Sequence, residues 1–384
     1  MPLTGSSRPG PGASDRLVAL GWNEVTADLF AAHDGAGLIA GRVIAIHRET
    51  SIVATGEGTL PASVTGRLRF AALAPGDYPA VGDWVALDLG PADRTDGAVI
   101  AAILPRRSAF RRSRPAAGRS GRAAGGLADE QVMAANVDVA LLVAGLDNDF
   151  NLRRIERYLA VAAASQIRSV VVLNKVDVAQ DLDARRDALA RIAPGVPIAT
   201  VSARTHAGLA ELSSELAPGT TAVILGSSGV GKSTLVNALL GEHRQATATV
   251  RGSDDRGRHT TTHRELFILP SGALLIDTPG IRSLEVLGAQ EGVEQVFGDI
   301  DELAFLCRFR DCRHENEPGC AVMAAIGDGR LSDDRLASHR KLERELAHVA
   351  RTTDPRARAE ERRRWRLIQK SVNLHTDLKN RDTS

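Results

Sequence analysis

The most specific pattern in the sequence lies at residues 226–233, which read GSSGVGKS and match G-x-x-x-x-G-K-[ST] without a mismatch. It follows the apolar run TAVIL and opens a helical run, which is the context that a phosphate-binding loop requires. Backbone N–H groups of such a loop surround the phosphates, and the helix N-terminus adds a favourable field. We expect Lys232 to reach the terminal phosphates and the Ser233 hydroxyl to bind Mg²⁺.

A second motif, DTPG, follows the apolar run ALLI at a suitable distance beyond the phosphate loop. Asp277 at the end of a strand can hold Mg²⁺ through water, and the Gly280 N–H can contact a γ-phosphate. The residue after the motif is Ile281, where many GTPases place a glutamine that orients the attacking water. Because isoleucine cannot do this, another group in the chain or a partner must.

The motif NKVD at residues 174–177 predicts which base is bound. An ionised carboxylate only accepts hydrogen bonds, so Asp177 can accept from both N1–H and N2–H₂ of guanine. Adenine offers no such pair, which makes the site selective for GTP over ATP. Ser202 and Ala203 follow the next strand and fit the companion loop, in which a backbone N–H meets guanine O6.

The order of these motifs is unusual. In ordinary GTP-binding domains the phosphate loop comes first and the NKxD motif last, whereas here NKVD precedes the phosphate loop. Joining neighbouring termini and cutting elsewhere can preserve such a fold, so we interpret the domain as a circularly permuted GTPase. The predicted GTP-binding residues are Asn174, Lys175, Val176, Asp177, Ser202, Ala203, Gly226, Ser227, Ser228, Gly229, Val230, Gly231, Lys232, Ser233 and Thr234.

A polar, glycine-containing stretch at residues 248–266 lies between the phosphate loop and DTPG and is typical of a nucleotide-sensing loop. One of its consecutive threonines, Thr260 to Thr262, should bind Mg²⁺ in the GTP state, and we favour Thr262. His259 beside them is our candidate for orienting the attacking water. The predicted catalytic residues are therefore His259, Lys232 and Gly280, and the predicted magnesium ligands are Ser233, Thr262 and Asp277.

The three cysteines of the chain lie within fourteen residues, in the pattern Cys307-x₄-Cys312-x-His314-x₅-Cys320. An odd number of clustered cysteines argues against a disulfide framework and towards a metal. Three thiolates and an imidazole fill a tetrahedral zinc shell and leave no position open. We therefore predict one structural zinc per chain rather than a catalytic one.

The elements that must position these residues fall into four regions. Residues 1–37 are expected to form a disordered tail. Residues 38–112 hold short apolar runs, among them GRVIAIH, RLRF and GDWVALDL, and predict a small β-barrel such as an OB-fold, although a sandwich or an SH3-like barrel would read similarly. Residues 113–294 alternate apolar strands with amphipathic helices, which is typical of a parallel sheet covered on both faces. Residues 295–384 should form a mainly helical zinc-binding domain.

Composition adds little about partners, because the formal net charge is only +1. The Arg/Gly-rich connector at residues 105–130, expected to be a mobile linker, is an exception: it carries seven arginines between residues 106 and 122 and no acid there. Such a segment attracts polyanions such as RNA, or is simply a solvated linker. We find no apolar run long enough to cross a membrane and no secretory signal, and expect a cytoplasmic, monomeric protein.

Together these motifs resemble the ribosome small-subunit-dependent GTPase A family of circularly permuted bacterial GTPases. The likeness covers residues 38–370 and includes GDWVAL, FNLRRIERYL, RHTTTHREL and the Cys/His pattern. The resemblance implies an OB-fold, a permuted GTPase domain and a zinc domain. It also implies binding to the small (30S) ribosomal subunit and its rRNA, which stimulates GTP hydrolysis late in maturation and assists the release of another assembly factor. In that family the histidine that corresponds to His259 has been considered for catalysis.

Two other functions fit the motifs. One is a nucleotide-gated RNA-binding checkpoint that acts on another RNA, such as tRNA or mRNA. The other is a stand-alone GTPase, whose turnover on free GTP would not respond to ribosomal subunits.

Overall fold

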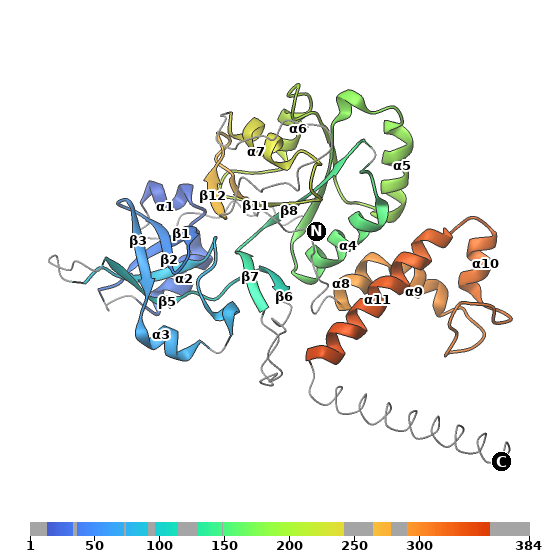
Figure 1. Ribbon diagram of the computed structural model, residues 1–384, viewed down its shortest axis with the longest axis horizontal. Coiled ribbons are helices and arrows are strands. Elements are labelled where there is room, and N and C mark those ends of the chain that lie inside the picture. Colours follow the sequence, from blue (N-terminus) through green and yellow to red (C-terminus); the bar gives the residue numbers. More distant parts are fainter. Residues whose placement is uncertain are drawn as a thin grey trace, which may run out of the picture.

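The computed structural model describes residues 14–33, 37–72, 74–90, 97–113, 130–147, 149–241, 264–277 and 290–353 (Figure 1). Within these ranges the strands are β1 (Ile39–His47), β2 (Thr50–Thr55), β3 (Thr59–Val64), β4 (Trp84–Asp88), β5 (Ala98–Ile103), β6 (Ala109–Ser113), β7 (Glu130–Ala135), β8 (Val139–Gly145), β9 (Arg168–Asn174), β10 (Ile198–Val201), β11 (Thr221–Leu225), β12 (Glu265–Ile268) and β13 (Leu274–Asp277). The helices are α1 (Asp15–Ala19), α2 (Glu24–Ala31), α3 (Gly66–Ala71), α4 (Leu152–Ala164), α5 (Leu182–Ile192), α6 (Leu209–Ser214), α7 (Lys232–Leu240), α8 (Gln290–Val296), α9 (Gly298–Ala304), α10 (Ala321–Gly327) and α11 (Asp333–Thr353).

Strands β1 to β5 close into a barrel, as the sequence predicts. They are hydrogen-bonded in the order β1-β2-β3-β5-β4, and β4 pairs again with β1 to close the ring. All these pairings are antiparallel except that of β3 with β5. Apolar side chains from the inner face, including Val43, Val53, Val85 and Ile100, are fully buried in its core. The barrel lies at the left of Figure 1, drawn in blue.

The prediction of a strand at RLRF, residues 67–70, is wrong. These residues belong to the helix α3, whose first turn is capped where the Leu68 N–H donates to Thr65 Oγ1. None of the α3 side chains is buried, so burial does not impose a strand, and the cap favours a helix. The third strand of the barrel is instead β3, which carries the sequence TLPASV.

The expectation that residues 1–37 form a disordered tail is wrong for residues 14–33, which contain α1 and α2. The side chains of Ser14 and Asn23 cap these two helices. Between the helices lies Trp22, whose ring packs edge-on against Trp84 of the barrel and against Phe30 of α2. Burial of these three aromatic side chains stabilises the segment against the barrel, which the Pro- and Gly-rich composition of residues 1–13 did not lead us to expect.

The connector expected at residues 105–130 is ordered at both ends, which corrects the prediction of a mobile linker there. Strand β6 pairs with β7, with Phe110 opposite Ala134, and both residues are fully buried. Burial of this apolar pair stabilises the two-stranded sheet. Residues 114–129, which hold Arg114, Arg119 and Arg122, lie outside the described part of the chain.

The central sheet has the strand order β10-β9-β8-β11-β13-β12, and its strands are parallel except for β12. The strands β8, β11 and β13 are buried throughout, as expected for a sheet covered on both faces. Strand β11, which leads into the phosphate loop, lies in the middle of the sheet although β8, β9 and β10 precede it in the chain. This strand order agrees with the circular permutation that the order of the motifs predicts.

Backbone pairing and a buried side chain both join the barrel to the central sheet. Strand β1 pairs with β12, with Ala45 opposite Glu265, so the described strands of both form one continuous eleven-stranded sheet. The side chain of Arg42 is 1% exposed, and it donates hydrogen bonds to the carbonyl oxygens of Leu20, Gly82 and Asn136 and to Thr221 Oγ1. Burial lowers the pKa of Arg42 to about 10, so the side chain stays charged at neutral pH.

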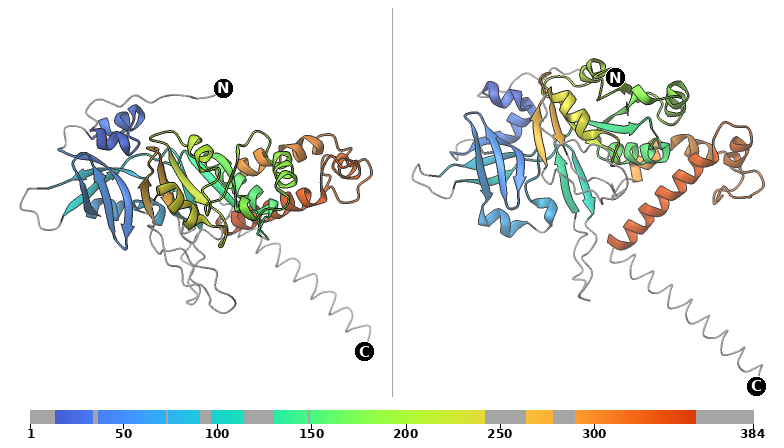
Figure 2. Two further views of the ribbon diagram at one scale, coloured as in Figure 1. Left: turned by 90° about the horizontal axis from the view of Figure 1, so that it is seen from above. Right: turned by 45° about the horizontal axis from the view of Figure 1, so that its top comes forward.

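The C-terminal part is helical, as predicted, and packs against α4 of the central domain. The expected boundary at residue 294 falls inside α8, which is described from Gln290 to Val296. In Figures 1 and 2 the helices α8 and α11 lie beside α4, and α10 lies at the far end of the molecule from the barrel. No helix in the described ranges combines the length and apolarity needed to span a membrane.

Candidate functional site

The phosphate loop runs from the end of β11 to the first turn of α7. Its glycines Gly229 and Gly231 have φ angles of +87° and +91°, which side chains with a Cβ rarely adopt. A Cβ at Gly231 would also lie 2.5 Å from Asn174 Nδ2. Lys232 begins α7, and its Nζ lies across the loop and donates to the carbonyl oxygens of Gly226 and Ser227 at 2.9 and 2.6 Å.

Asn174 brings the separate motifs together. Its Nδ2 donates to the carbonyl oxygen of Val230 in the phosphate loop at 2.8 Å. Its Oδ1 accepts from the backbone N–H of Ala203 at 3.0 Å. The side chain is 2% exposed, so this buried amide fixes the NKVD motif, the loop after β10 and the phosphate loop against one another.

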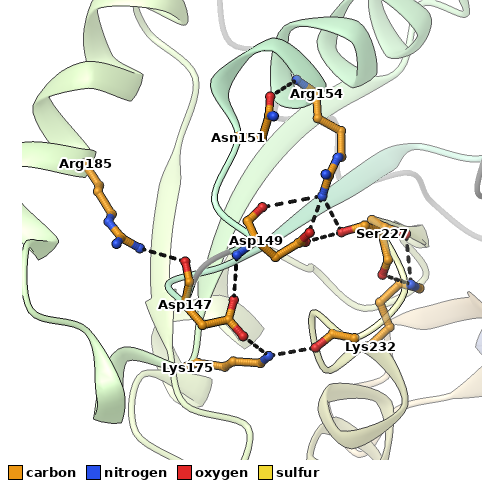
Figure 3. A network of polar contacts seen from close by, with 10 residues as sticks. Asp147, Asp149, Asn151, Arg154, Lys175, Arg185, Ser227 and Lys232 are labelled. Carbon is orange, nitrogen blue, oxygen red and sulfur yellow. Dashed lines mark hydrogen bonds and ion pairs between the residues drawn. The ribbon is translucent and has the colours of Figure 1, made fainter. Parts of the chain in front are cut away.

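Lys175 extends along the phosphate loop. Its Nζ donates to the carbonyl oxygen of Gly229 at 2.7 Å and to Asp147 Oδ2, as Figure 3 shows. Partial burial raises the pKa of Asp147, but the hydrogen bonds from Lys175 and from the Asp149 N–H outweigh it and hold the pKa below its ordinary value. These contacts fix the ammonium group of Lys175 between the loop after β8 and the phosphate loop.

Asp177 presents an ionised carboxylate. Ser202 Oγ donates to its Oδ1 at 2.6 Å, and the exposed Arg204 pairs with its Oδ2. The hydrogen bond from Ser202, together with the charge of Arg204, lowers the pKa of Asp177 against the effect of burial. At neutral pH this group therefore only accepts hydrogen bonds, as guanine recognition requires.

Three residues of this region were not predicted from the sequence. Asp149 lies in the loop after β8, and its carboxylate accepts hydrogen bonds from Ser227 Oγ and, at 2.8 Å, from the guanidinium of Arg154. The same guanidinium donates to Ser227 Oγ at 2.6 Å (Figure 3). Asp147 and Asp149 follow the end of a buried parallel strand, as NKVD and the phosphate loop do. Applying that rule to every strand would have found them.

The structure describes two of the three residues predicted to bind Mg²⁺. Asp277 is buried at the end of β13, which is adjacent and parallel to β11, so its carboxylate lies at the same sheet edge as the phosphate loop. Ser233 lies in the first turn of α7. The structure thus brings these two oxygen donors to one edge, which suits Mg²⁺. Thr262, His259 and Gly280 lie outside the described residues.

The four residues of the Cys/His pattern converge, with all their ligand atoms within 4.8 Å of one another. His314 Nδ1 lies 3.6 Å from Cys307 Sγ and 3.5 Å from Cys320 Sγ, and these two sulfurs are 4.0 Å apart. Zinc bonded tetrahedrally to sulfur at about 2.3 Å and to nitrogen at about 2.0 Å needs sulfur–sulfur separations of about 3.8 Å and sulfur–nitrogen separations of about 3.5 Å. The cluster, completed by Cys312, therefore fits a zinc ion.

Backbone N–H groups are directed at two of the cysteine sulfurs. The N–H groups of Ala321 and Met323, at the start of α10, point to the sulfurs of Cys307 and Cys320 at 3.4 Å. Such N–H groups stabilise thiolates, which are the form that binds a metal. Arg340 of α11 donates to the carbonyl oxygens of Arg313 and His314 and ties the cluster to the long helix.

The sequence and the fold of this chain are similar to those of the same group of known proteins. The family model described as RsgA GTPase matches residues 103–287. A protein of Opitutus terrae called small ribosomal subunit biogenesis GTPase RsgA is 46% identical over 92% of this chain and 95% of its own length. A protein of the same name from Streptomyces coelicolor is 44% identical over 91% of this chain and 92% of its own length.

Two solved structures have a similar fold. YjeQ from Thermotoga maritima is 27% identical, with a TM-score of 0.56 over 80% of this chain and 98% of that chain. YloQ, described as a circularly permuted GTPase, is 24% identical, with a TM-score of 0.54 over 82% of this chain and 96% of that chain. The second likeness concerns the fold alone.

Proposed function

The chain belongs to the RsgA GTPase family, and from that premise we propose that it hydrolyses GTP as a late maturation factor of the small ribosomal subunit. In this proposal the subunit and its rRNA stimulate hydrolysis, and the GTPase cycle helps to release another assembly factor. The proposal is supported by the convergence of the NKVD and phosphate-loop motifs and by a Cys/His cluster that fits zinc, in a chain whose relatives, matched over nine-tenths of its length, are named for small-subunit biogenesis.

We propose the predicted GTP-binding residues as the nucleotide site, with guanine at Asp177 and phosphates at Lys232. Asn174 supports this assignment, because its hydrogen bonds hold the base-recognition and phosphate-binding motifs together. Mg²⁺ would be held by Ser233 and Asp277 with Thr262, and would neutralise charge on the phosphates. His259 and Gly280 are proposed to act at the γ-phosphate.

We propose one structural zinc per chain at the Cys/His cluster and a monomeric protein. We retain the division into a barrel, a GTPase domain and a zinc-binding domain as a proposal, and we place the boundary of the last domain before α8 so that this helix is not divided. The barrel and the zinc-binding domain are proposed to contact the subunit.

Exposed aromatic side chains beside the zinc cluster support contact with RNA. Phe305 and Leu306 are 89% and 72% exposed, and Phe309 is 43% exposed. The guanidinium of Arg308 lies 5.5 Å from the ring centroid of Phe309, and Arg310 and Arg313 nearby are exposed. Unpaired bases stack on aromatic and guanidinium planes of this kind.

The GTPase rate with and without purified small subunits tests the proposed function. We expect small subunits to raise turnover by at least about tenfold, since catalytic groups supplied in trans are worth about 10³–10⁵ in other GTPases and Ile281 leaves the glutamine position unfilled. Large subunits and tRNA serve as controls. Stimulation by tRNA alone would favour the checkpoint on another RNA, and a rate that ignores every RNA would favour a stand-alone enzyme.

Replacing Phe305 with alanine should weaken binding to the small subunit while leaving GTP binding unchanged. One base–aromatic stack is worth about 1–3 kcal/mol, so the dissociation constant should rise roughly fivefold to a hundredfold. The measurement is equilibrium binding of fluorescently labelled protein to purified subunits. Leu306→Ala is the matched control, because its side chain is adjacent and exposed but cannot stack. If both variants bind equally weakly, the contact is apolar rather than stacking.

A further inference from the structure

Four charged residues near the start of α4, between Arg153 and Arg157, contact two different parts of the molecule. One of them, Arg154, points to the phosphate loop, whereas Arg153, Glu156 and Arg157 form ion pairs with α11 of the C-terminal part. Less than two helical turns therefore separate the nucleotide site from the docking surface of the zinc-binding domain. These residues lie in the stretch FNLRRIERYL, which is part of the family resemblance, but the sequence assigned no role to any of them.

On the nucleotide side, Arg154 and Asp149 hold Ser227, the second residue of the phosphate loop. The Arg154 guanidinium donates to Asp149 Oδ2 and to Ser227 Oγ, and Ser227 Oγ donates to Asp149 Oδ2 (Figure 3). The carbonyl oxygen of Ser227 in turn accepts from Lys232 Nζ at 2.6 Å. The position of α4 thus fixes Ser227, the phosphate-loop residue whose carbonyl oxygen Lys232 contacts.

On the domain side, Glu156 is 2% exposed and pairs with Arg335 of α11 at 2.8 Å. Arg335 also binds Asp299 of α9 through two nitrogens at 2.7 Å and stacks over Phe297, 4.9 Å from its ring centroid. This is a buried ion pair with its hydrogen bonds satisfied, and removing one partner from such a pair is strongly destabilising.

A second contact keeps the same two parts close together. Gly292 of α8 packs directly on the backbone of α4, because a Cβ at this position would lie 2.0 Å from the Ala160 carbonyl oxygen and 2.8 Å from the Ala164 N–H nitrogen. Any side chain at residue 292 would push the two helices apart. Displacement of the C-terminal helices therefore requires α4 either to move with them or to lose its buried contacts.

We propose that Arg154 and Asp149 are positioning residues of the phosphate loop, and that α4 couples them to the zinc-binding domain through Glu156 and Arg335. When the domain is docked, α4 holds Ser227 and, through it, the loop that binds phosphates. When the domain is displaced, the first turn of α4 loosens and the nucleotide leaves faster. The inference rests on the proposed nucleotide site and adds a route separate from the stretch at 248–266 and DTPG.

A double-mutant cycle on the full-length protein tests this coupling without ribosomal subunits. The readout is the dissociation rate of a fluorescent GDP analogue. Arg335→Lys, which keeps the charge but loses the forked hydrogen bonds, should raise the rate roughly threefold to tenfold, the range typical of residues along a coupling route. In an Arg154→Gln background the same substitution should change the rate by less than about twofold, because the link to Ser227 is already broken.

Controls separate coupling from general destabilisation. Arg153→Gln removes an exposed ion pair between the same two helices that does not reach the phosphate loop, so it should leave the rate unchanged. Glu156→Gln perturbs the buried pair from the other side and replaces Arg335→Lys if that variant loses its zinc or its cooperative melting transition. Equal effects of Arg335→Lys in both backgrounds, or no effect of either docking variant, would overturn the proposal.

Failure of this test and failure of the proposed function are distinguishable. A positive cycle without any stimulation by small subunits would leave α4 coupling in place and remove the ribosomal role. If the effects of Arg335→Lys and Arg154→Gln on the dissociation rate are additive while small subunits strongly stimulate GTP hydrolysis, the ribosomal role stands and α4 does not couple the two parts.

Discussion

Asp177→Asn is expected to exchange the base preference of the protein from GTP to xanthosine triphosphate. Asparagine presents one acceptor and one donor where the carboxylate presents two acceptors, which suits N1–H and the 2-oxo group of xanthine. Two hydrogen bonds to a charged group are worth about 1.5–3 kcal/mol each, so GTP affinity should fall roughly 10²–10⁴-fold. Competition of both nucleotides against a fluorescent analogue gives the two affinities.

Two matched variants make this result specific. Asp181→Asn changes an exposed aspartate four residues later, which makes no capping hydrogen bond to its helix, and should preserve guanine preference. Arg204→Ala removes the exposed partner of Asp177 and should change affinity less than Asp177→Asn, since Ser202 still holds the carboxylate. A guanine preference that survives in Asp177→Asn would refute the assignment of NKVD to base recognition.

The convergence of the candidate nucleotide-binding motifs could be predicted because each motif is encoded in a short stretch. The phosphate loop and NKVD each place their groups through local backbone geometry, and the rule that ligands bind beyond strand ends brings the motifs together. Asn174 confirms that assembly by touching both Val230 and Ala203. Arg154 escaped prediction because it lies on a helix and not at a strand end, and its partner Ser227 is more than seventy residues away. Asp149 follows the end of β8, where the same rule would have found it.

The errors in the fold have a similar origin. Trp22 finds Trp84 across the barrel surface, a contact that composition cannot foresee in a stretch next to a Pro- and Gly-rich start. Phe110 lies among arginines in sequence and is nevertheless fully buried against β7. RLRF alternates like a strand, but a local cap at Thr65 makes it a helix. In each case tertiary packing or capping outweighed the local pattern.

Loss of zinc should unfold the segment around the cluster. Structural zinc contributes about 10–16 kcal/mol in small zinc-binding peptides, so Cys312→Ser or a chelator should free residues 307–327, including α10. We expect one zinc per chain by metal analysis, and faster hydrogen exchange in α10 when the metal is removed. Subunit binding should weaken more than GTP binding, because the nucleotide motifs lie in another domain.

Asp311→Ser is the matched control, since it alters the exposed neighbour of Cys312 and leaves the four ligands in place. It should retain its zinc and the exchange rate of α10. Freshly purified protein without zinc would contradict the assignment of the cluster, and unchanged exchange after zinc removal would contradict its structural role.

The buried Arg42 side chain has a consequence for the order in which the chain folds during synthesis. One of its partners, Thr221, lies 179 residues further along, and the strand that extends the barrel sheet, β12, comes later still. At about 5–20 residues per second, that separation corresponds to roughly ten to forty seconds of translation. The barrel leaves the ribosome first but carries a buried cation whose acceptors are incomplete until β11 has emerged. We therefore expect the nascent barrel to reach its final stability only after the first half of the GTPase sheet has been made.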